Sequence, residues 1–208
     1  MTGRFITIEG GEGAGKSTAQ AFLARRIEAA GHVVRQSREP GGTPLAEAIR
    51  QTLLSAEGEV PVALTELLLV FAARAQHVAK VIEPALQQHE WVICDRFTDA
   101  TYAYQGAARG MSTEVIAQLE RLVQGARRPD VVLLLDMPPE VGLARARARG
   151  ELDRFEREEI EFYYRVRAGY LDRAMAMPDR YRVLDASQDL EGVQEQLQSV
   201  ADEWLNDC

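Results

Sequence analysis

Several residue types are scarce in this chain of 208 residues, and each scarcity limits what the protein can be. The two cysteines, Cys94 inside an apolar run and Cys208 at the end, are too few for a disulfide framework or a metal cluster. We therefore expect Cys94 to be buried in the core. No apolar run approaches the ~18 residues of a membrane span, and a strand-like run begins almost at once, at Arg4. We expect no membrane partner, no signal peptide and a cytoplasmic location.

Basic residues are outnumbered, because 24 lysines and arginines face 32 acidic residues, which gives a formal net charge of -8. Duplex nucleic acid normally requires a basic stripe or patch, so we expect no nucleic-acid partner. A small anionic substrate would instead need a local basic pocket. Only Lys16 and Lys80 are lysines, so almost all of the positive charge is arginine. The three histidines, His32, His77 and His89, have no spacing that indicates a metal site, and we assign them no chemistry.

Apolar runs alternate with longer stretches of helical spacing along the whole chain. The runs are short and rich in Val, Ile and Leu, which predicts strands buried on both faces. Strands that alternate with helices predict an α/β fold, a doubly wound parallel five-stranded sheet flanked by helices. We find no linker and expect a single domain over residues 1–208. The predicted strands are 5–9, 33–37, 91–95, 131–136 and 181–184, and the predicted helices are 16–30, 44–56, 64–88, 112–124, 139–149, 153–175 and 190–204.

The sequence GGEGAGKS at residues 10–17 matches the P-loop pattern G-x-x-x-x-G-K-[ST] and lies between the first predicted strand and helix. Glycines let backbone N–H groups converge on phosphate oxygens, and the helix N-terminus adds a favourable dipole. Lys16 supplies a charge for the β- and γ-phosphates, and the Ser17 hydroxyl can ligate Mg²⁺. The sequence therefore predicts a fold of the P-loop NTPase type. The expected ATP-binding residues are Gly10, Gly11, Glu12, Gly13, Ala14, Gly15, Lys16 and Ser17.

Other classes of P-loop protein fit less well. A switch GTPase needs an Asn-Lys-x-Asp motif, but the only asparagine is Asn206 and no lysine follows it. A motor or DNA translocase normally has a larger chain and basic nucleic-acid surfaces. A small-molecule kinase remains, and so does a module that binds ATP without turnover. Such a module would need neither an arginine for an acceptor phosphate nor an arginine in a lid.

Two predicted strands end in an aspartate, at the sheet edge where open α/β sheets bind ligands. Asp95 is followed at once by Arg96, so a carboxylate and a guanidinium lie together there. Asp95 can hold Mg²⁺ directly or through water, and Arg96 can grip an acceptor phosphate as a planar fork. Asp136 ends the other strand and competes with Asp95 for the metal. The prolines that follow it favour a role for Asp136 in capping the next turn.

Six segments together resemble bacterial thymidylate kinases (dTMP kinases) over nearly the full length. They are IEGGEGAGKS from residue 8, REPGGTPLAEAIR from 38, LLLVFAAR from 67, DRFTDATYAYQG from 95, RPD from 128 and RARARGELDRFE from 145. The resemblance implies in-line transfer of the γ-phosphoryl group of ATP, with Mg²⁺, to dTMP. The product would be dTDP for dTTP biosynthesis, and the enzyme would be a homodimer. A kinase for another nucleoside monophosphate or a small metabolite is the alternative.

The resemblance also implies a role for each residue that matches the family motifs. Glu12 would reach the sugar 3′-hydroxyl of dTMP, and Arg96 would bind its phosphate. Tyr104 would pack beneath C2′ and leave no space for a 2′-hydroxyl, which selects a deoxynucleotide. The other expected substrate-binding residues are Glu39, Arg50, Phe71, Arg74, Thr101 and Gln105.

By the same resemblance, Arg74 would hydrogen-bond a thymine carbonyl, while Thr101 and Gln105 would approach the edge of the base. Relatives often carry a stacking aromatic four residues before this arginine, where the present chain has Val70. Phe71 lies three residues before Arg74, on nearly the same face of the predicted helix. Phe71 can therefore either stack on thymine or pack in the core.

A basic run, ARARARG, occupies residues 144–150. Bacterial thymidylate kinases keep a catalytic arginine in a mobile lid, which implies a small helical lid at about 140–156 with Arg149 in that role. A lid arginine neutralises charge on the transferred phosphoryl group. Arg145, four residues earlier, shares a helix face with it and is expected to bind ATP, whereas Arg147 can be a solvated charge. The expected catalytic residues are Lys16, Arg96, Arg149 and Glu12, and the expected metal ligands are Ser17 and Asp95.

Overall fold

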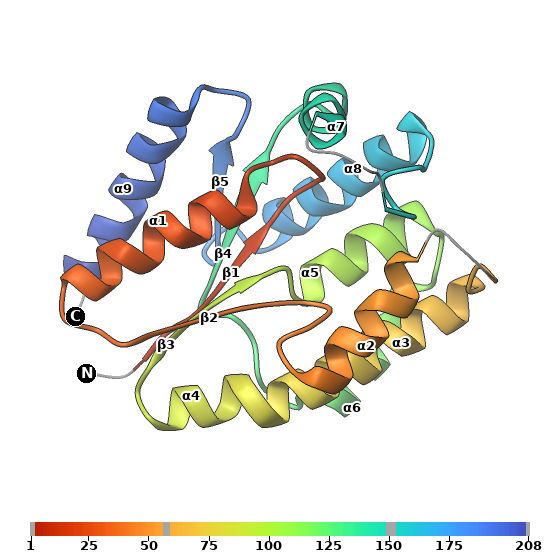
Figure 1. Ribbon diagram of the computed structural model, residues 1–208, viewed down its shortest axis with the longest axis horizontal. Helices are drawn as coiled ribbons and strands as arrows, with labels where there is room; N and C mark the ends of the chain where they lie inside the picture. Colours follow the sequence, from red (N-terminus) through yellow and green to blue (C-terminus); the bar gives the residue numbers. More distant parts are fainter. Residues whose placement is uncertain (1–2, 56–58, 149–152, 207–208) are drawn as a thin grey trace.

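The computed structural model describes residues 3–55, 59–148 and 153–206 and shows the predicted α/β architecture (Figure 1). All strand pairs of its five-stranded sheet are parallel, and the strand order is β2-β3-β1-β4-β5. The prediction of a doubly wound parallel five-stranded sheet is confirmed. The strands are β1 (Phe5–Glu9), β2 (Val34–Arg38), β3 (Trp91–Asp95), β4 (Val131–Asp136) and β5 (Tyr181–Asp185).

The helices follow the strands in alternation, with one long helical run between β2 and β3. This run covers residues 63–87 without a break, close to the predicted 64–88, and its middle turn, η1, is π-helical. The helices are α1 (Lys16–Ala29), α2 (Pro44–Leu54), α3 (Ala63–His77), η1 (Val78–Ile82), α4 (Glu83–Gln87), α5 (Thr98–Thr101), η2 (Tyr102–Ala108), α6 (Thr113–Gln124), α7 (Pro139–Arg147), α8 (Ile160–Ala176) and α9 (Leu190–Asn206).

Helices α1 and α9 cover one face of the sheet, and α4 and α8 cover the other (Figure 1). Because successive strand residues point to opposite faces, β1 contributes to both layers. Ile6 and Ile8 pack in the same cluster as Trp204 of α9, whereas Phe5 packs in the cluster beneath η1 and α4. Cys94 is fully buried in this second cluster, as predicted.

The prediction that every strand is buried on both faces is wrong for β2 and β5. These are the two edge strands, and each has one side next to solvent rather than another strand. Arg35 and Gln36 of β2 are exposed, and Val183 of β5 is half exposed. A short apolar run therefore predicts a strand here but not its place in the sheet.

Two helical segments differ from the sequence prediction. The helix expected from residue 153 begins at Ile160, because residues 153–158 form turns. In those turns Glu156 N donates to Asp153 Oδ1 (2.9 Å), and Asp153 N donates to Glu156 Oε2 (3.1 Å). The second difference is the helical stretch α5–η2, which the apolar spacing of the sequence does not predict.

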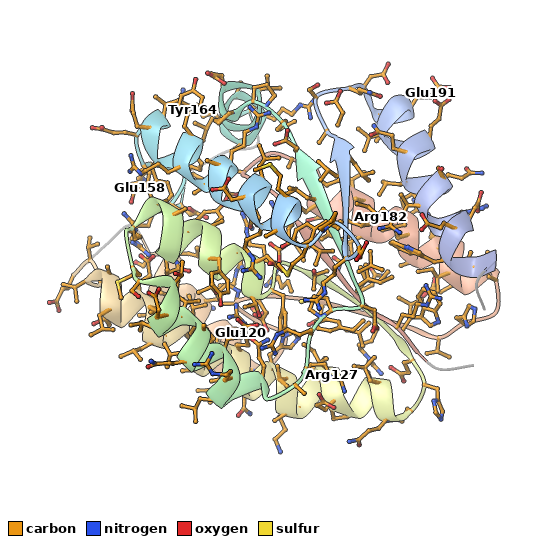
Figure 2. The ribbon with its side chains drawn as sticks, turned by 180° about the vertical axis from the view of Figure 1, so that it is seen from behind. Glu120, Arg127, Glu158, Tyr164, Arg182 and Glu191 are labelled. Atoms are coloured by element: carbon orange, nitrogen blue, oxygen red, sulfur yellow. The ribbon has the colours of Figure 1, made fainter. Side chains whose placement is uncertain are left out.

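The exposed rims of the fold carry ion pairs between neighbouring elements. Figure 2 shows Arg127 just beyond the end of α6, where its Nε and Nη2 donate to the Glu83 carboxylate of α4 at 2.6 and 3.0 Å. Figure 2 also shows Arg182 on β5 beside α9, whose Glu203 accepts a hydrogen bond from it at 2.5 Å. Such partly exposed pairs contribute about 0–1 kcal/mol each. Among the described residues, no helix has the length and apolar character that crossing a membrane requires.

Candidate active site

The P-loop crosses the carboxyl edge of the sheet between β1 and α1, at the place that the sequence predicts. Gly13 has φ +70°, and a Cβ on it would lie 2.0 Å from the carbonyl oxygen of Gly142 in α7. In return, a Cβ on Gly142 would lie 2.3 Å from the Glu12 carbonyl oxygen. The P-loop and α7 therefore touch backbone to backbone, and both positions require glycine.

Lys16 is buried at the start of α1 and lies under the loop. Its Nζ donates to the carbonyl oxygens of Gly11 (2.7 Å) and Gly10 (3.2 Å). Burial, followed by the positive charge of Arg96, lowers the pKa of Lys16 from its usual value. A phosphate anion in the loop would offset both effects, because it supplies the charge partner that a buried ammonium needs.

An open recess in front of the P-loop brings together most of the predicted ATP-binding residues, and we call it the loop recess. It is lined by Glu12, Gly13, Ala14, Gly15, Lys16, Ser17, Thr18, Gln20, Arg38, Arg50, Asp95, Arg96, Arg145, Ala146, Asp153 and Glu156. Gly10 and Gly11 lie behind it, against a small cavity next to Tyr163 and Tyr170. The loop recess thus contains both predicted metal ligands, Ser17 and Asp95.

A second recess opens between α2, α3 and α5–η2, and we call it the inner recess. It is lined by Glu12, Glu39, Pro40, Arg50, Leu53, Leu54, Val70, Arg74, Arg96, Phe97, Ala100, Thr101, Tyr104, Gln105, Asp153 and Phe155. All predicted substrate-binding residues except Phe71 are in this set. The inner and loop recesses share Glu12, Arg50, Arg96 and Asp153, so two ligands in them would meet there.

Three side chains form a closed set of hydrogen bonds at that junction. Arg96 Nη2 donates to Glu12 Oε1 (2.5 Å) and to the Tyr104 hydroxyl (3.0 Å), and this hydroxyl donates to the same Glu12 oxygen (3.0 Å). Burial alone would lower the pKa of Arg96, but Glu12 and nearby groups raise it well above its usual value. Arg96 is a non-glycine residue with φ +66°, a conformation that is uncommon and often found at functional sites.

The junction also concentrates positive charge. Arg38, Arg50 and Arg96 all line the loop recess. Burial, followed by the positive charges of Arg38 and Arg96, lowers the pKa of Arg50. Guanidinium groups this close repel one another unless an anion lies between them. In a chain of net charge -8, this is the local basic pocket that a small phosphorylated substrate requires.

Arg74 lines the inner recess, and most of its hydrogen-bonding groups already have protein partners. Its Nε donates to Glu39 Oε2 (2.7 Å), and its Nη2 donates to Phe97 O (3.0 Å) and Thr101 Oγ1 (2.9 Å). Nη1 is buried and has no hydrogen-bond partner in the part of the chain that the structure describes. Because an unsatisfied buried donor costs about 1–3 kcal/mol, this nitrogen fits a ligand acceptor such as a carbonyl oxygen.

The structure places Phe71 in the core, away from the inner recess. It packs with Leu67 and Ile116 and lies against the Arg74 guanidinium, 4.9 Å from ring centroid to Cζ. Val70 lines the recess instead. Of the two possibilities that the sequence leaves open, the geometry favours core packing for Phe71 and corrects its assignment to the substrate pocket.

The two acidic residues that compete for a metal have different surroundings. Both carboxylate oxygens of Asp136 accept from Arg167, Oδ1 from Nε and Oδ2 from Nη2, each at 2.8 Å. Asp95 Oδ1 is buried and lacks a hydrogen-bond partner among the described residues. Asp95, with this orphaned oxygen, lines the same recess as Ser17 and the P-loop, and carboxylate and hydroxyl oxygens are suitable donors for Mg²⁺. The predicted capping role of Asp136 is not seen, since its side chain is paired with α8.

Arg145 lies at the rim of the loop recess, and Arg149 lies outside the described residues. Arg145 Nη1 donates to Ala186 O (2.9 Å), which joins α7 to the segment after β5. Between this arginine, the start of α1 and residues 186–190 there is a further recess, the side recess, lined also by Thr18, Phe22 and Leu197. It continues from the P-loop and has mixed apolar and polar walls.

Glu9, the last residue of β1, is fully buried directly before the P-loop. It accepts hydrogen bonds from Phe97 N (2.7 Å) and the Tyr170 hydroxyl (2.9 Å). Burial, followed by the nearby Asp99 carboxylate, raises the pKa of Glu9 to about 8. The carboxyl group thus ties the P-loop strand to α5 and α8.

The sequence interpretation missed residues after the basic run. Asp153 lines both the inner and the loop recess, and Phe155 lines the inner recess with its ring 5.9 Å from that of Tyr104. Arg154 anchors them, because its Nε donates to Leu53 O (2.7 Å) and its Nη2 to Glu66 (2.7 Å). The segment DRFE was part of the resemblance, but no role was attached to its individual residues.

Comparisons with known proteins agree with this geometry. The family model for thymidylate kinase matches residues 8–197. The chain is 60% identical over 205 residues to a thymidylate kinase of Pseudomonas syringae pv. tomato, covering 99% of this chain and 98% of the relative. It is 59% identical over 208 residues to one of Ectopseudomonas mendocina, covering 100% and 99%. The crystal structure of thymidylate kinase from Ehrlichia chaffeensis superimposes with a TM-score of 0.79 at 36% identity, covering 97% and 99%.

Proposed function

Since the chain belongs to the thymidylate kinase family and phosphorylates dTMP with ATP, we propose that dTMP occupies the inner recess and ATP the loop recess. The observation that carries this assignment is the junction of the two recesses at Glu12 and Arg96. A nucleotide in each would place its phosphate end at the same arginine. The product, dTDP, is an intermediate of dTTP biosynthesis, and the whole reaction takes place within one kinase domain.

The inner recess suits each part of dTMP. The uncommitted Nη1 of Arg74 supports a hydrogen bond to a thymine carbonyl, with Thr101 and Gln105 at the base edge and Val70 against its face. Arg96 binds the acceptor phosphate, and Glu12 accepts from the 3′-hydroxyl. Tyr104, held by both of these side chains, lies beneath the sugar and excludes a 2′-hydroxyl.

ATP binds with its phosphates on the P-loop amides and Lys16. Its adenine occupies the side recess, where Arg145 and the segment 186–190 form the walls. The segment at about 140–156 acts as the lid and brings Arg149 to the transferred phosphoryl group. An arginine in this role neutralises developing charge and contributes roughly 10³-fold or more in rate.

Ser17 and Asp95 would hold the Mg²⁺ of the nucleotide, and the Oδ1 of Asp95 that lacks a protein partner fits this role. The ion would supply charge neutralisation for the phosphates of ATP. Lys16 and Arg96 hold the donor and acceptor phosphates in line, and the shared junction excludes water from between them. Transfer is direct, because catalysis by placement and charge neutralisation requires no covalent enzyme intermediate.

The enzyme is a homodimer that associates through α3 and α6. These helices pack together through Leu67, Phe71 and Ile116, and their outer faces carry exposed apolar side chains. The exposed fraction is 51% for Leu64, 48% for Leu68, 37% for Val115 and 80% for Leu122. Adjacent exposed apolar residues on paired helices are typical of an association surface. The reaction is placed in the cytoplasm, where ATP and dTMP are both found.

The test of the proposed function is ADP production by the purified protein from ATP and Mg²⁺ with dTMP, dUMP, dGMP, CMP, AMP or shikimate. We expect dTMP to give the highest kcat/KM. dUMP lacks only the thymine methyl, which is worth about 1–3 kcal/mol, so it should be a poor substrate. A higher value for any other acceptor would overturn the assignment of the inner recess, and ATP binding without turnover of any acceptor would indicate a non-catalytic module.

A further inference from the structure

His77 lies at the end of α3 and belongs to none of the roles described so far. Its side chain is fully buried, and both ring nitrogens have hydrogen-bond partners. Nδ1 contacts Glu39 Oε1 at 2.8 Å, and Nε2 contacts Ser37 Oγ at 2.7 Å. Both polar atoms of the buried ring are thus satisfied, and one of the two partners, Glu39, lines the inner recess.

The contact between His77 and Glu39 determines how Glu39 pairs with Arg74. Glu39 is 3% exposed, and burial tends to raise its pKa, but Arg74 and His77 together lower that pKa. Glu39 is therefore an anion, so Nδ1 of His77 is the donor and carries a proton. Each carboxylate oxygen then has one partner, Oε2 with Arg74 and Oε1 with His77.

Because His77 occupies Oε1, the Arg74 guanidinium makes only one hydrogen bond to Glu39, from Nε to Oε2. Without the donor on Nδ1, Oε1 would be a buried acceptor without a partner, beside a fork of five N–H groups. Carboxylate and guanidinium then favour a bidentate pair. That rearrangement would draw Arg74 away from Thr101 and Phe97 and turn Nη1 away from its present direction.

Ser37 and Gly42 hold the other side of the imidazole. The Ser37 hydroxyl donates to Nε2 when the ring is neutral, which leaves the proton on Nδ1. Gly42 has φ +82°, and a Cβ on it would lie 2.5 Å from His77 Cδ2 and 2.6 Å from Ser37 Oγ. The loop before α2 thus lies close against the ring, and a side chain at Gly42 would collide with it.

We propose that His77 is a positioning residue for base recognition, which acts through Glu39 to aim the free Nη1 of Arg74 at the thymine. The inference rests on the proposed function of the inner recess and deepens it, because it adds a residue that does not touch the nucleotide. The chain Ser37–His77–Glu39–Arg74 runs from the edge strand β2 through α3 to the recess.

The test compares His77→Asn with His77→Gln. The side-chain NH₂ of asparagine can occupy the position of Nδ1 and still donate to Glu39. The side-chain amide of glutamine is longer and instead reaches the position of Nε2, next to Ser37. We expect His77→Gln to raise KM for dTMP about tenfold, with kcat and KM for ATP within about twofold of wild type. His77→Asn should recover most of that loss.

Steady-state kinetics and thermal unfolding of both variants decide the matter. An equal rise of KM for dTMP in both would overturn the proposal, as would a lower Tm with unchanged KM, because His77 would then be structural. A parallel loss of kcat and KM for ATP would also overturn it. The wild-type rate with dTMP, measured alongside, tests the proposed function separately.

A spectroscopic measurement on folded protein covers the case in which the glutamine variant does not fold. In a His32→Gln, His89→Gln background, ¹⁵N-labelled His77 should show one slowly exchanging imidazole N–H, on Nδ1. Saturating dTMP should shift this resonance, and a non-hydrolysable ATP analogue alone should leave it in place. A proton on Nε2, or a resonance that dTMP does not move, would contradict the proposal.

Discussion

Arg96 Nη2 lies 2.5 Å from Glu12 Oε1, which joins the first residue after β3 to the middle of the P-loop. The contact crosses the junction between the inner and loop recesses. An arginine already paired with a carboxylate keeps its orientation before any phosphate arrives. Less side-chain freedom is then lost on binding, and this preorganisation strengthens the grip on the acceptor.

Removing Arg96 should therefore abolish most of the activity. Arg96→Ala is expected to lower kcat/KM for dTMP by about 10²–10³-fold, because a charge-assisted contact to the phosphate disappears and Glu12 loses its partner. Arg96→Lys should recover only part of this, since it lacks the planar fork. The matched control is Arg35→Ala, which removes an exposed arginine paired with Glu90. An equal fall of kcat/KM for dTMP in Arg35→Ala would contradict the assignment of Arg96 to the acceptor phosphate.

Two variants of Tyr104 can separate the role of its hydroxyl in catalysis from the role of its ring in excluding a 2′-hydroxyl. Its hydroxyl holds Glu12 and Arg96, whereas its ring lies where a 2′-hydroxyl would be. Tyr104→Phe should lower kcat but keep the preference for dTMP over its ribonucleotide. Tyr104→Ala should reduce that preference about tenfold as the ring volume is lost. Measured kcat/KM ratios for the two nucleotides decide, and the same relaxed ratio in both variants would count against the ring.

Metal removal should stop the reaction and be reversible. Chelation with EDTA is expected to abolish turnover, and added Mg²⁺ should restore it. Asp95→Asn should raise the Mg²⁺ concentration for half-maximal rate about tenfold, because an orphaned carboxylate oxygen loses its charge. Asp172→Asn, at an exposed position of α8, serves as the control. If Asp136→Asn rather than Asp95→Asn shifts the Mg²⁺ titration, the ligand assignment is reversed.

The buried Glu9 should make stability depend on pH in the neutral range. Burial raises its pKa to about 8 in the folded chain, against a usual value of 4.5. Between these values the folded state binds the extra proton, so its contribution to the free energy of unfolding is complete below about 4.5 and is lost as pH rises through about 8. Glu9→Gln should flatten this part of the urea-unfolding profile. An unchanged slope would show that another group causes it.

The exposed face of α3 and α6 predicts the behaviour of a dimer-breaking variant. Leu122→Glu places a charge at a leucine that is 80% exposed and should convert the dimer to a monomer. Met175→Glu, at a methionine of α8 that is 73% exposed, should leave the mass unchanged. Light scattering after size-exclusion chromatography measures both. A monomeric wild-type protein would refute the proposed homodimer.

The sequence predicts the position of the P-loop and of the Asp95–Arg96 pair because each motif lies within a few consecutive residues. The P-loop pattern defines a strand, a turn and a helix within a few residues, and the Asp95–Arg96 pair follows an apolar run directly. Strands β3 and β4 end at Asp95 and Asp136, as the sequence predicts. The sequence already favours Asp95 over Asp136 as the metal ligand, but the ion pair between Asp136 and Arg167, 31 residues apart in the chain, could not be predicted from it.

Other parts of the site could not be predicted, because they depend on contacts between segments that are far apart in the sequence. Val70 and Phe71 are adjacent on one helix, and only the packing of α3 on α6 shows which of them faces the recess. The turns at 153–158 carry helix-forming residues, but Arg154 is held by Leu53 and Glu66 from distant helices. Tertiary contacts of this kind override local propensity. His77 was overlooked for the same reason, since its partners come from β2 and the loop that follows it.

The two glycines that touch, Gly13 and Gly142, also set a mechanical limit on the enzyme. Because their backbones are in contact, the first part of α7 is clamped to the loop that carries the donor phosphates. The proposed lid at about 140–156 would therefore have to bend after Gly142. A phosphate bound at the P-loop would then rest on the same backbone that anchors α7, which would couple donor binding to the proposed lid.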